Sequence, residues 1–124
     1  MLADNDAIAT VAVKDLEAAR KFYANTLGLK QVEDDGGEAI VFKSGKSILN
    51  VYRSRYAGTN QATAMTWAVE DVDGIVRELE AKGVKFERYD MPDVKMEGDV
   101  HVFGKTRVAW FKDPDGNILS LINQ

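Results

Sequence analysis

The sequence predicts an α+β fold made of two similar modules, each with the element order β-α-β-β-β. Two observations carry this prediction. An alternating strand pattern that ends in an aspartate helix cap occurs twice, and Asp71 lies 56 residues after Asp15. An amphipathic helical stretch that stops at a glycine also occurs twice, at Gly28 and, 55 residues later, at Gly83. Such a constant offset indicates a duplicated supersecondary unit.

The first module begins with a strand at 11–13 and continues into a helix expected over 15–27. Asp15 supplies the N-cap, and Gly28 stops the helix because glycine tolerates the left-handed conformation of a C-terminal cap. Three short β-rich runs follow, which predict strands over 30–33, 38–43 and 47–53.

The second module repeats this order with a clearer helix. Val72, Ile75, Val76 and Leu79 follow the spacing of one helical face. Strands are expected at 86–89, somewhere within 95–108 extending to residue 111, and at 118–122. The turn at 113–117 contains proline and glycine and predicts a tight hairpin loop between the last two strands.

The domain organisation expected from these modules is a single domain over 1–124. Module one spans about 7–53, a mostly polar connector spans 54–63, and module two spans about 64–124. Mixed sheets brought together with the helices outside would bury both apolar helix stripes.

Composition narrows the classes of function. Of 124 residues, 45% are hydrophobic and 29% are charged, as in soluble proteins, and no apolar run approaches the ~20 residues of a membrane helix. No leader pattern opens the sequence, so we expect a cytoplasmic location and no membrane partner. The net charge of −4 without a basic cluster argues against nucleic acid. With no cysteine, disulfides, thiolate metal sites and thiol nucleophiles are excluded.

The paired modules, together with the segments 15–23, 27–29 and 111–117, resemble the vicinal oxygen chelate superfamily. Its members include glyoxalase I, extradiol dioxygenases, fosfomycin resistance enzymes and bleomycin resistance proteins. The resemblance implies sheets that form a cup and four inward side chains that hold one divalent metal, which polarises two adjacent substrate oxygens. It also implies a homodimer, whose modules pair either within one chain or across two.

The resemblance places the four metal-ligand positions at Ile8, Asn50, Ala64 and Ser120. These positions repeat at offsets of 56 and 70 residues, as the modules do. None carries the imidazole, carboxylate or thiolate that a first-row divalent metal prefers. We therefore predict no metal at this place and no other cofactor.

Strand alternation predicts what would line the cup, because residues two apart share a face. The expected ligand-binding set is largely apolar with a few neutral hydrogen-bonding groups, which suits a neutral, partly aromatic organic ligand. Its members are Ile8, Thr10, Ile48, Asn50, Tyr52, Ala64, Thr66, Ile118, Ser120 and Ile122.

A second hypothesis concerns His101, the only histidine. On one continuous strand it would share a face with Glu97 and Asp99, forming a displaced site for one divalent metal or an acid–base site. A solvated face or a bend at Gly98 is the more common meaning of such a pattern. The segment 90–96 is a candidate for a mobile loop at the rim of the cup. The arginines that could clamp an anion are Arg53, Arg55 and Arg107. The aromatic rings that could stack on a ligand are Tyr52, Tyr56, Tyr89, Phe103, Trp110 and Trp67, of which Trp67 is expected to face the helix.

The favoured hypothesis is a metal-free protein of the small-molecule binding or resistance type, and the balance leans against an enzyme. The other hypothesis is a glyoxalase-like lyase or a dioxygenase, with the displaced metal site or with a metal-independent mechanism. Fold alone does not decide between them.

Overall fold

The computed structural model describes residues 1–34 and 37–124. The chain forms two compact units, Met1–Thr59 and Asn60–Gln124. Their boundary falls inside the connector predicted at 54–63. The organisation of the two units as a single domain stays a prediction.

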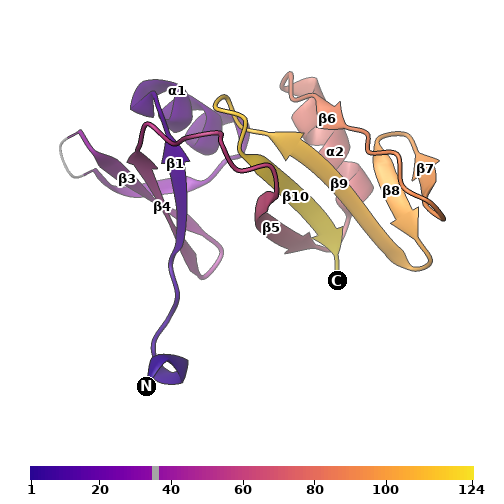
Figure 1. The fold of residues 1–124 in the computed structure, drawn as a ribbon, viewed down its shortest axis with the longest axis horizontal. Coiled ribbons are helices and arrows are strands. Elements are labelled where there is room, and N and C mark those ends of the chain that lie inside the picture. The colour runs from indigo at the N-terminus through magenta and orange to yellow at the C-terminus, as the bar shows by residue number, and fades with distance from the viewer. Residues whose placement is uncertain (35–36) are drawn as a thin grey trace. The chain divides into compact units, whose positions relative to one another are not determined.

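The first unit has the predicted order β-α-β-β-β, preceded by a short 3₁₀ turn (Figure 1). Its sheet has the order β1-β4-β3-β2, with β1 parallel to β4 and the other pairs antiparallel. The elements are η1 (Leu2–Asp4), β1 (Ala9–Val13), α1 (Leu16–Arg20), η2 (Lys21–Thr26), β2 (Lys30–Asp34), β3 (Ala39–Ser44) and β4 (Ser47–Arg53).

The helix of the first unit begins as predicted but changes its pitch. The Asp15 carboxylate accepts hydrogen bonds from the backbone N–H groups of Glu17 and Ala18, which fixes the start of α1. From residue 21 the helix continues as the π-helical segment η2. It stops before Gly28, whose φ of 76° suits a C-terminal cap. The apolar spacing predicts one helical stripe and does not distinguish an α-helix from a π-helix.

The core of the first unit lies between its sheet and its helix. Ile40 and Phe42 on β3 are fully buried, and their ladder partners on β4 are the buried Val51 and Leu49. The Tyr23 ring of η2 lies 5.9 Å from the Phe42 ring, measured between centroids. These contacts identify the side of the sheet that faces the helix.

The second unit contains one hairpin more than predicted. The run expected within 95–111 is three strands, because turns at Gly98 and Gly104, with φ of 63° and 59°, reverse the chain twice. The sheet has the order β5-β10-β9-β8-β7, β6 pairs with β9, and β5 is parallel to β10. The elements are β5 (Thr63–Val69), α2 (Val72–Ala81), β6 (Phe86–Glu87), β7 (Lys95–Glu97), β8 (Val100–Phe103), β9 (Thr106–Lys112) and β10 (Ile118–Asn123).

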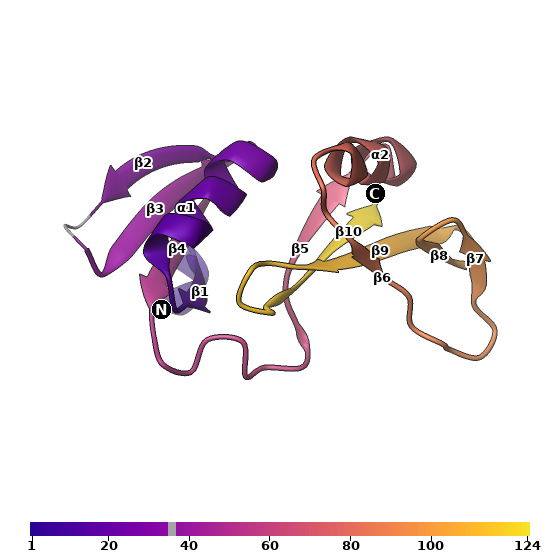
Figure 2. The same ribbon diagram turned by 90° about the horizontal axis from the view of Figure 1, so that it is seen from above.

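Helix α2 runs along one face of this sheet (Figure 2). The Asp71 carboxylate caps it by accepting the Gly74 backbone N–H at 3.0 Å. Trp67 stacks on Phe111, with ring centroids 6.5 Å apart and 18° between the planes. Phe111 lies on the face of β9 that carries Arg107, which bonds Asp73 of α2, so Trp67 faces the helix as predicted.

No helix in the described ranges combines the length and the apolar character that a membrane crossing requires.

Candidate functional site

We call the side of each sheet that is turned away from its helix the open face. On the open face of the first unit, Asn50 of β4 lies between Thr10 of β1 and Val41 of β3. Tyr52 lies beside Ala39 in the same way. The residues predicted on β1 and β4 therefore do share a face, as strand alternation requires.

Two details of this face differ from the predicted set. Ile8 precedes β1 rather than belonging to it, and 56% of its surface is exposed. Lys43 of β3 lies opposite Ile48 and adds a positive charge to a face that was expected to be neutral. The sequence pattern of β3 alone does not say which face carries Lys43, so this charge was not predicted.

On the open face of the second unit, Ser120 of β10 lies between Thr66 of β5 and Trp110 of β9. The hydroxyl oxygens of Thr66 and Ser120 are 2.6 Å apart and form a hydrogen bond in which either can donate. Only 3% of Ser120 is exposed. Each hydroxyl thus has its partner in the neighbouring strand.

A β-bulge shifts the register between β5 and β10 beside Ile118. Thr63 pairs with Ile118 and Met65 pairs with Leu119, so Ala64 is the extra residue between two ladder positions. The predicted set assumed an unbroken alternation along β5, and the inserted residue shifts it, so Ala64 does not hold the place beside Ile118. Thr63 takes that place, and its hydroxyl oxygen accepts the Trp110 indole N–H at 3.1 Å.

The hypothesis that Glu97, Asp99 and His101 share one face required one continuous strand, and it is wrong because the chain turns at Gly98, the bend that was the alternative. In the β7–β8 hairpin, His101 pairs with Met96 while Glu97 pairs with Val100, so the Glu97 and His101 side chains point to opposite faces. Asp99 lies in the turn between the strands. The turn breaks the two-residue alternation on which the expectation depended.

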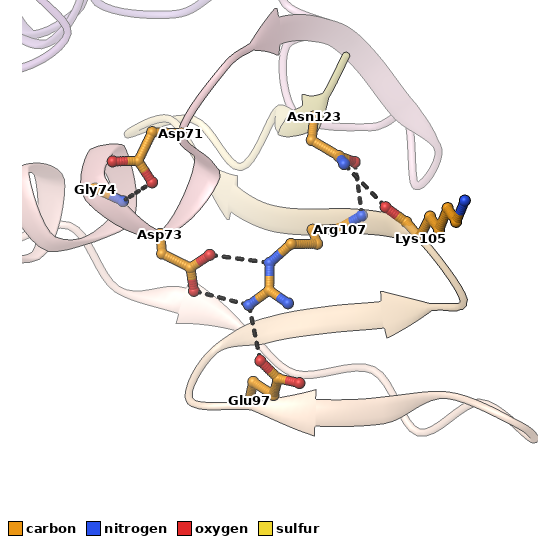
Figure 3. A network of polar contacts seen from close by, with 7 residues as sticks. All are labelled: Asp71, Asp73, Gly74, Glu97, Lys105, Arg107 and Asn123. Atoms are coloured by element: carbon orange, nitrogen blue, oxygen red, sulfur yellow. Dashed lines mark hydrogen bonds and ion pairs between the residues drawn. The ribbon is translucent and has the colours of Figure 1, made fainter.

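The acids of this hairpin have partners of their own. Arg107 donates to both carboxylate oxygens of Asp73, at 2.9 and 3.0 Å, and to Glu97 at 3.0 Å (Figure 3). The hydrogen bond to Asp73, and next the one to Glu97, raise the pKa of Arg107. Asp99 is paired with Arg88 at 3.4 Å. These contacts join α2, β7 and β9, and they pair Arg107 with carboxylates of the protein itself rather than with a bound anion.

The other two arginines considered as anion clamps are also engaged. Arg53 pairs with Glu38 at 2.9 Å, and Arg55 donates to the Tyr56 hydroxyl at 2.8 Å. Within residues 1–34 and 37–124, no three side chains among His, Asp and Glu are grouped so that they could hold a metal ion.

His101 lies instead in an aromatic cluster on the open face of the second unit, which we call the Tyr89–His101–Trp110 cluster. His101 is fully buried, and its Nε2 accepts the backbone N–H of Tyr89 at 2.9 Å. Trp110 stands edge-on to His101 at 4.8 Å and to Tyr89 at 5.4 Å, measured between ring centroids. Because Nε2 accepts, neutral His101 carries its proton on Nδ1.

Two polar atoms of this cluster are buried without a hydrogen-bond partner among the described residues: the Tyr89 hydroxyl and His101 Nδ1. Leaving such a group unpaired costs about 1–3 kcal/mol. Burial is the main cause that raises the pKa of Tyr89; the charge of Glu87 adds to it and that of Lys112 opposes it. The Tyr89 phenol is therefore a neutral donor at physiological pH.

A pocket of about 200 Å³ opens beside the cluster and carries no formal charge on its lining, which consists of Gln61, Ala62, Thr63, Tyr89, Met91, Trp110 and Ile118. A second hollow of about 200 Å³ shares Tyr89 and Met91 with it and is otherwise lined by Arg88, Asp90, Val94 and Met96. Residues of the predicted rim loop at 90–96 thus border both. Of the predicted ligand-binding set, Ile118 alone lines the first pocket.

The chain matches a known family. The profile of the Glyoxalase/Bleomycin resistance protein/Dioxygenase superfamily matches residues 6–121. The chain belongs to this superfamily. No curated protein sequence matches it.

Solved structures of this superfamily share the fold over nearly the whole chain. A glyoxalase family protein from Enterococcus faecalis aligns with a TM-score of 0.75 at 17% identity, covering 98% of this chain and 99% of that one. The fosfomycin resistance protein FosX from Listeria monocytogenes gives 0.74 at 16%, covering 98% and 93%. TnmS3, an antibiotic binding protein from Streptomyces sp. CB03234, gives 0.66 at 21%, covering 97% of each chain.

The metal that the superfamily implies does not fit the residues at the four positions predicted for it. Ile8 and Ala64 offer no donor atom, Asn50 offers a neutral amide, and the Ser120 hydroxyl is already bonded to Thr66. Divalent first-row metals bind imidazole, carboxylate and thiolate groups. The donor set at these positions therefore suits no such metal.

Proposed function

We propose that this protein binds a small, neutral, partly aromatic organic molecule and uses no metal at the four usual positions of its superfamily. The observation that carries the proposal is the uncharged pocket beside the Tyr89–His101–Trp110 cluster. Aromatic walls with a few fixed polar groups are the usual lining of a small-molecule site.

The volume of the pocket limits the size of its occupant. An engineered cavity of about 150 Å³ holds one benzene molecule, whereas drug-sized ligands occupy roughly 300–1,000 Å³. At about 200 Å³, this pocket suits one ring or two fused rings, or the corresponding part of a larger ligand.

The open face of the first unit supplies further neutral polar groups. The Asn50 amide, the Thr10 hydroxyl and the Tyr52 hydroxyl can donate or accept hydrogen bonds. We propose that the predicted residues on this face contact a ligand as well, with Lys43 limiting that ligand to a neutral or acidic edge.

The solved relatives agree with a binding or resistance role. One is described as an antibiotic binding protein and another as a fosfomycin resistance protein. By analogy with these proteins, we propose that this chain sequesters or carries a small organic compound. We also propose that it does so in the cytoplasm and as a homodimer. Light scattering should then give about twice the chain mass of 13.7 kDa, and the mass of one chain would contradict the dimer.

The test of the function is a thermal-shift screen against aromatic antibiotics, catechols and glutathione adducts, with and without divalent metals. A ligand at 100 times its Kd stabilises the folded state by about 2.7 kcal/mol. We expect stabilisation by aromatic compounds that does not depend on added metal. Stabilisation only when metal is present would contradict the proposal.

A further inference from the structure

We propose that the Tyr89–His101–Trp110 cluster selects planar ligands of one or two rings that carry a neutral hydrogen-bond acceptor, such as a ring ketone, and that this acceptor is bound by the Tyr89 hydroxyl. This inference rests on the proposed function and names the ligand class of its site in the second unit.

The first step is the fixed orientation of the Trp110 ring. Its indole N–H donates to the Thr63 hydroxyl at 3.1 Å, and its ring meets the edge-on His101 with 85° between the planes. Trp110 lines the pocket, and its only hydrogen-bond donor is already used. It therefore offers a ligand an apolar surface for ring contact rather than a polar contact.

The second step is the fixed position of Tyr89. Its backbone N–H is held by His101 Nε2 at 2.9 Å, and its ring packs edge-to-face on Trp110 with 72° between the planes. Two contacts thus hold Tyr89 in place, one through its backbone and one through its ring, while its hydroxyl has no hydrogen-bond partner in the described residues. A ligand acceptor would supply the missing partner and recover the cost of the unpaired group.

The third step concerns charge. The pocket lining carries no formal charge. The two charges that influence Tyr89 electrostatically, Glu87 and Lys112, lie 3.5 Å from each other as an ion pair. The site thus offers a neutral donor and no counter-charge for an ionised ligand, and a neutral acceptor is the group that it fits.

Two probes of similar size separate the acceptor from the ring. Chromone is a neutral bicyclic ketone with an acceptor and no donor, and naphthalene has two fused rings and no acceptor. We expect both probes to bind and chromone to bind more tightly, with binding measured by the change in tryptophan fluorescence. Tyr89→Phe should weaken chromone about tenfold, the equivalent of one neutral hydrogen bond, and change naphthalene less than about twofold.

Tyr56→Phe is the matched control, because it removes a tyrosine hydroxyl outside both proposed ligand contacts: Tyr56 is 63% exposed, and its hydroxyl accepts a hydrogen bond from Arg55. It should leave both probe affinities unchanged. Thr63→Val, which frees the Trp110 indole N–H, should weaken both probes because it acts on the ring surface. If Tyr89→Phe does not fold, nuclear Overhauser effects between chromone and the Met91 methyl group of the unaltered protein test the same placement.

The outcomes distinguish this inference from the proposed function. If Tyr89→Phe weakens the binding of chromone and naphthalene equally, or weakens the binding of neither, the inference is overturned. Binding of a screened ligand that depends on Asn50 but not on Tyr89 also overturns it and leaves the proposed function standing. Failure of every compound in the screen overturns both.

Discussion

Removing the Tyr89 hydroxyl should make the free protein more stable. The hydroxyl oxygen is buried and has no hydrogen-bond partner among the described residues, while the ring packs against Trp110 and His101. Tyr89→Phe keeps the ring and removes the unpaired group. Such a group costs about 1–3 kcal/mol, and because the whole Tyr89 residue is only half-buried we expect the lower end, about 1 kcal/mol.

The magnitude translates into a measurable shift. At about 2.1 cal/mol/K per residue, the 124 residues have an unfolding entropy near 0.26 kcal/mol/K, so about 1 kcal/mol raises Tm by about 4 °C. Urea unfolding followed by tryptophan fluorescence suits this test, because both tryptophans, Trp67 and Trp110, belong to the second unit.

The control and the refuting result are both specific. Tyr52→Phe removes a hydroxyl from a tyrosine that is 38% exposed and should change stability by less than about 0.5 kcal/mol. If Tyr89→Phe lowers stability by about 1 kcal/mol, the hydroxyl has a stabilising partner in the free protein and the reasoning fails. Higher stability together with weaker chromone binding is the signature of a hydroxyl kept for a ligand.

Three further predictions concern the second unit. Asp71→Ala removes the cap of α2 and should cost about 1 kcal/mol in urea unfolding, whereas no loss would show that the cap is dispensable. Asp73→Asn should lower Tm by an amount that stays constant between about pH 6 and pH 9. The pKa of Arg107 is raised, so Arg107 loses its charge and its pairing only as pH rises through that pKa. A loss of Tm confined to one end of this pH range would contradict the ion pair. A hydrogen bond with Asp99 raises the pKa of Glu80, so the stability that Glu80 contributes is present at low pH and is lost as pH rises through its folded pKa. The stability of Glu80→Gln relative to the unaltered protein should therefore increase as the pH rises from about 4 to about 7. If the two proteins give parallel profiles of stability against pH, this prediction is refuted.

The fold was predictable where the sequence repeats itself. The offset between Asp15 and Asp71 locates two helix caps, and both carboxylates accept backbone N–H groups as capping requires. Strand alternation also predicts correctly that Thr10 and Asn50 share the open face of the first unit. These predictions succeed because periodicity is a local property that neighbouring residues determine.

The candidate site was harder to predict because it depends on interruptions of that periodicity. The bulge at Ala64 puts Thr63 beside Ile118, and nothing in the local sequence marks an extra residue there. The hairpin at Gly98 separates Glu97 from His101, and that glycine was the available signal.

Tyr89 and Trp110 were found by sequence only as generic aromatic candidates. Pairing the strands on either side of the 113–117 turn would have placed Trp110 opposite Ser120, since the turn fixes the register of the hairpin. The contact between Tyr89 and His101 joins residues 12 apart through a backbone N–H, and no pattern of side chains predicts it.

The most direct test of a metal-free binding protein is ligand titration after metal analysis. Protein purified without chelator should contain no stoichiometric Ni, Zn, Mn or Fe. A compound selected by the thermal-shift screen should then bind with the same Kd in EDTA as in added divalent metal. One metal ion per chain, together with binding that EDTA abolishes, would contradict the account.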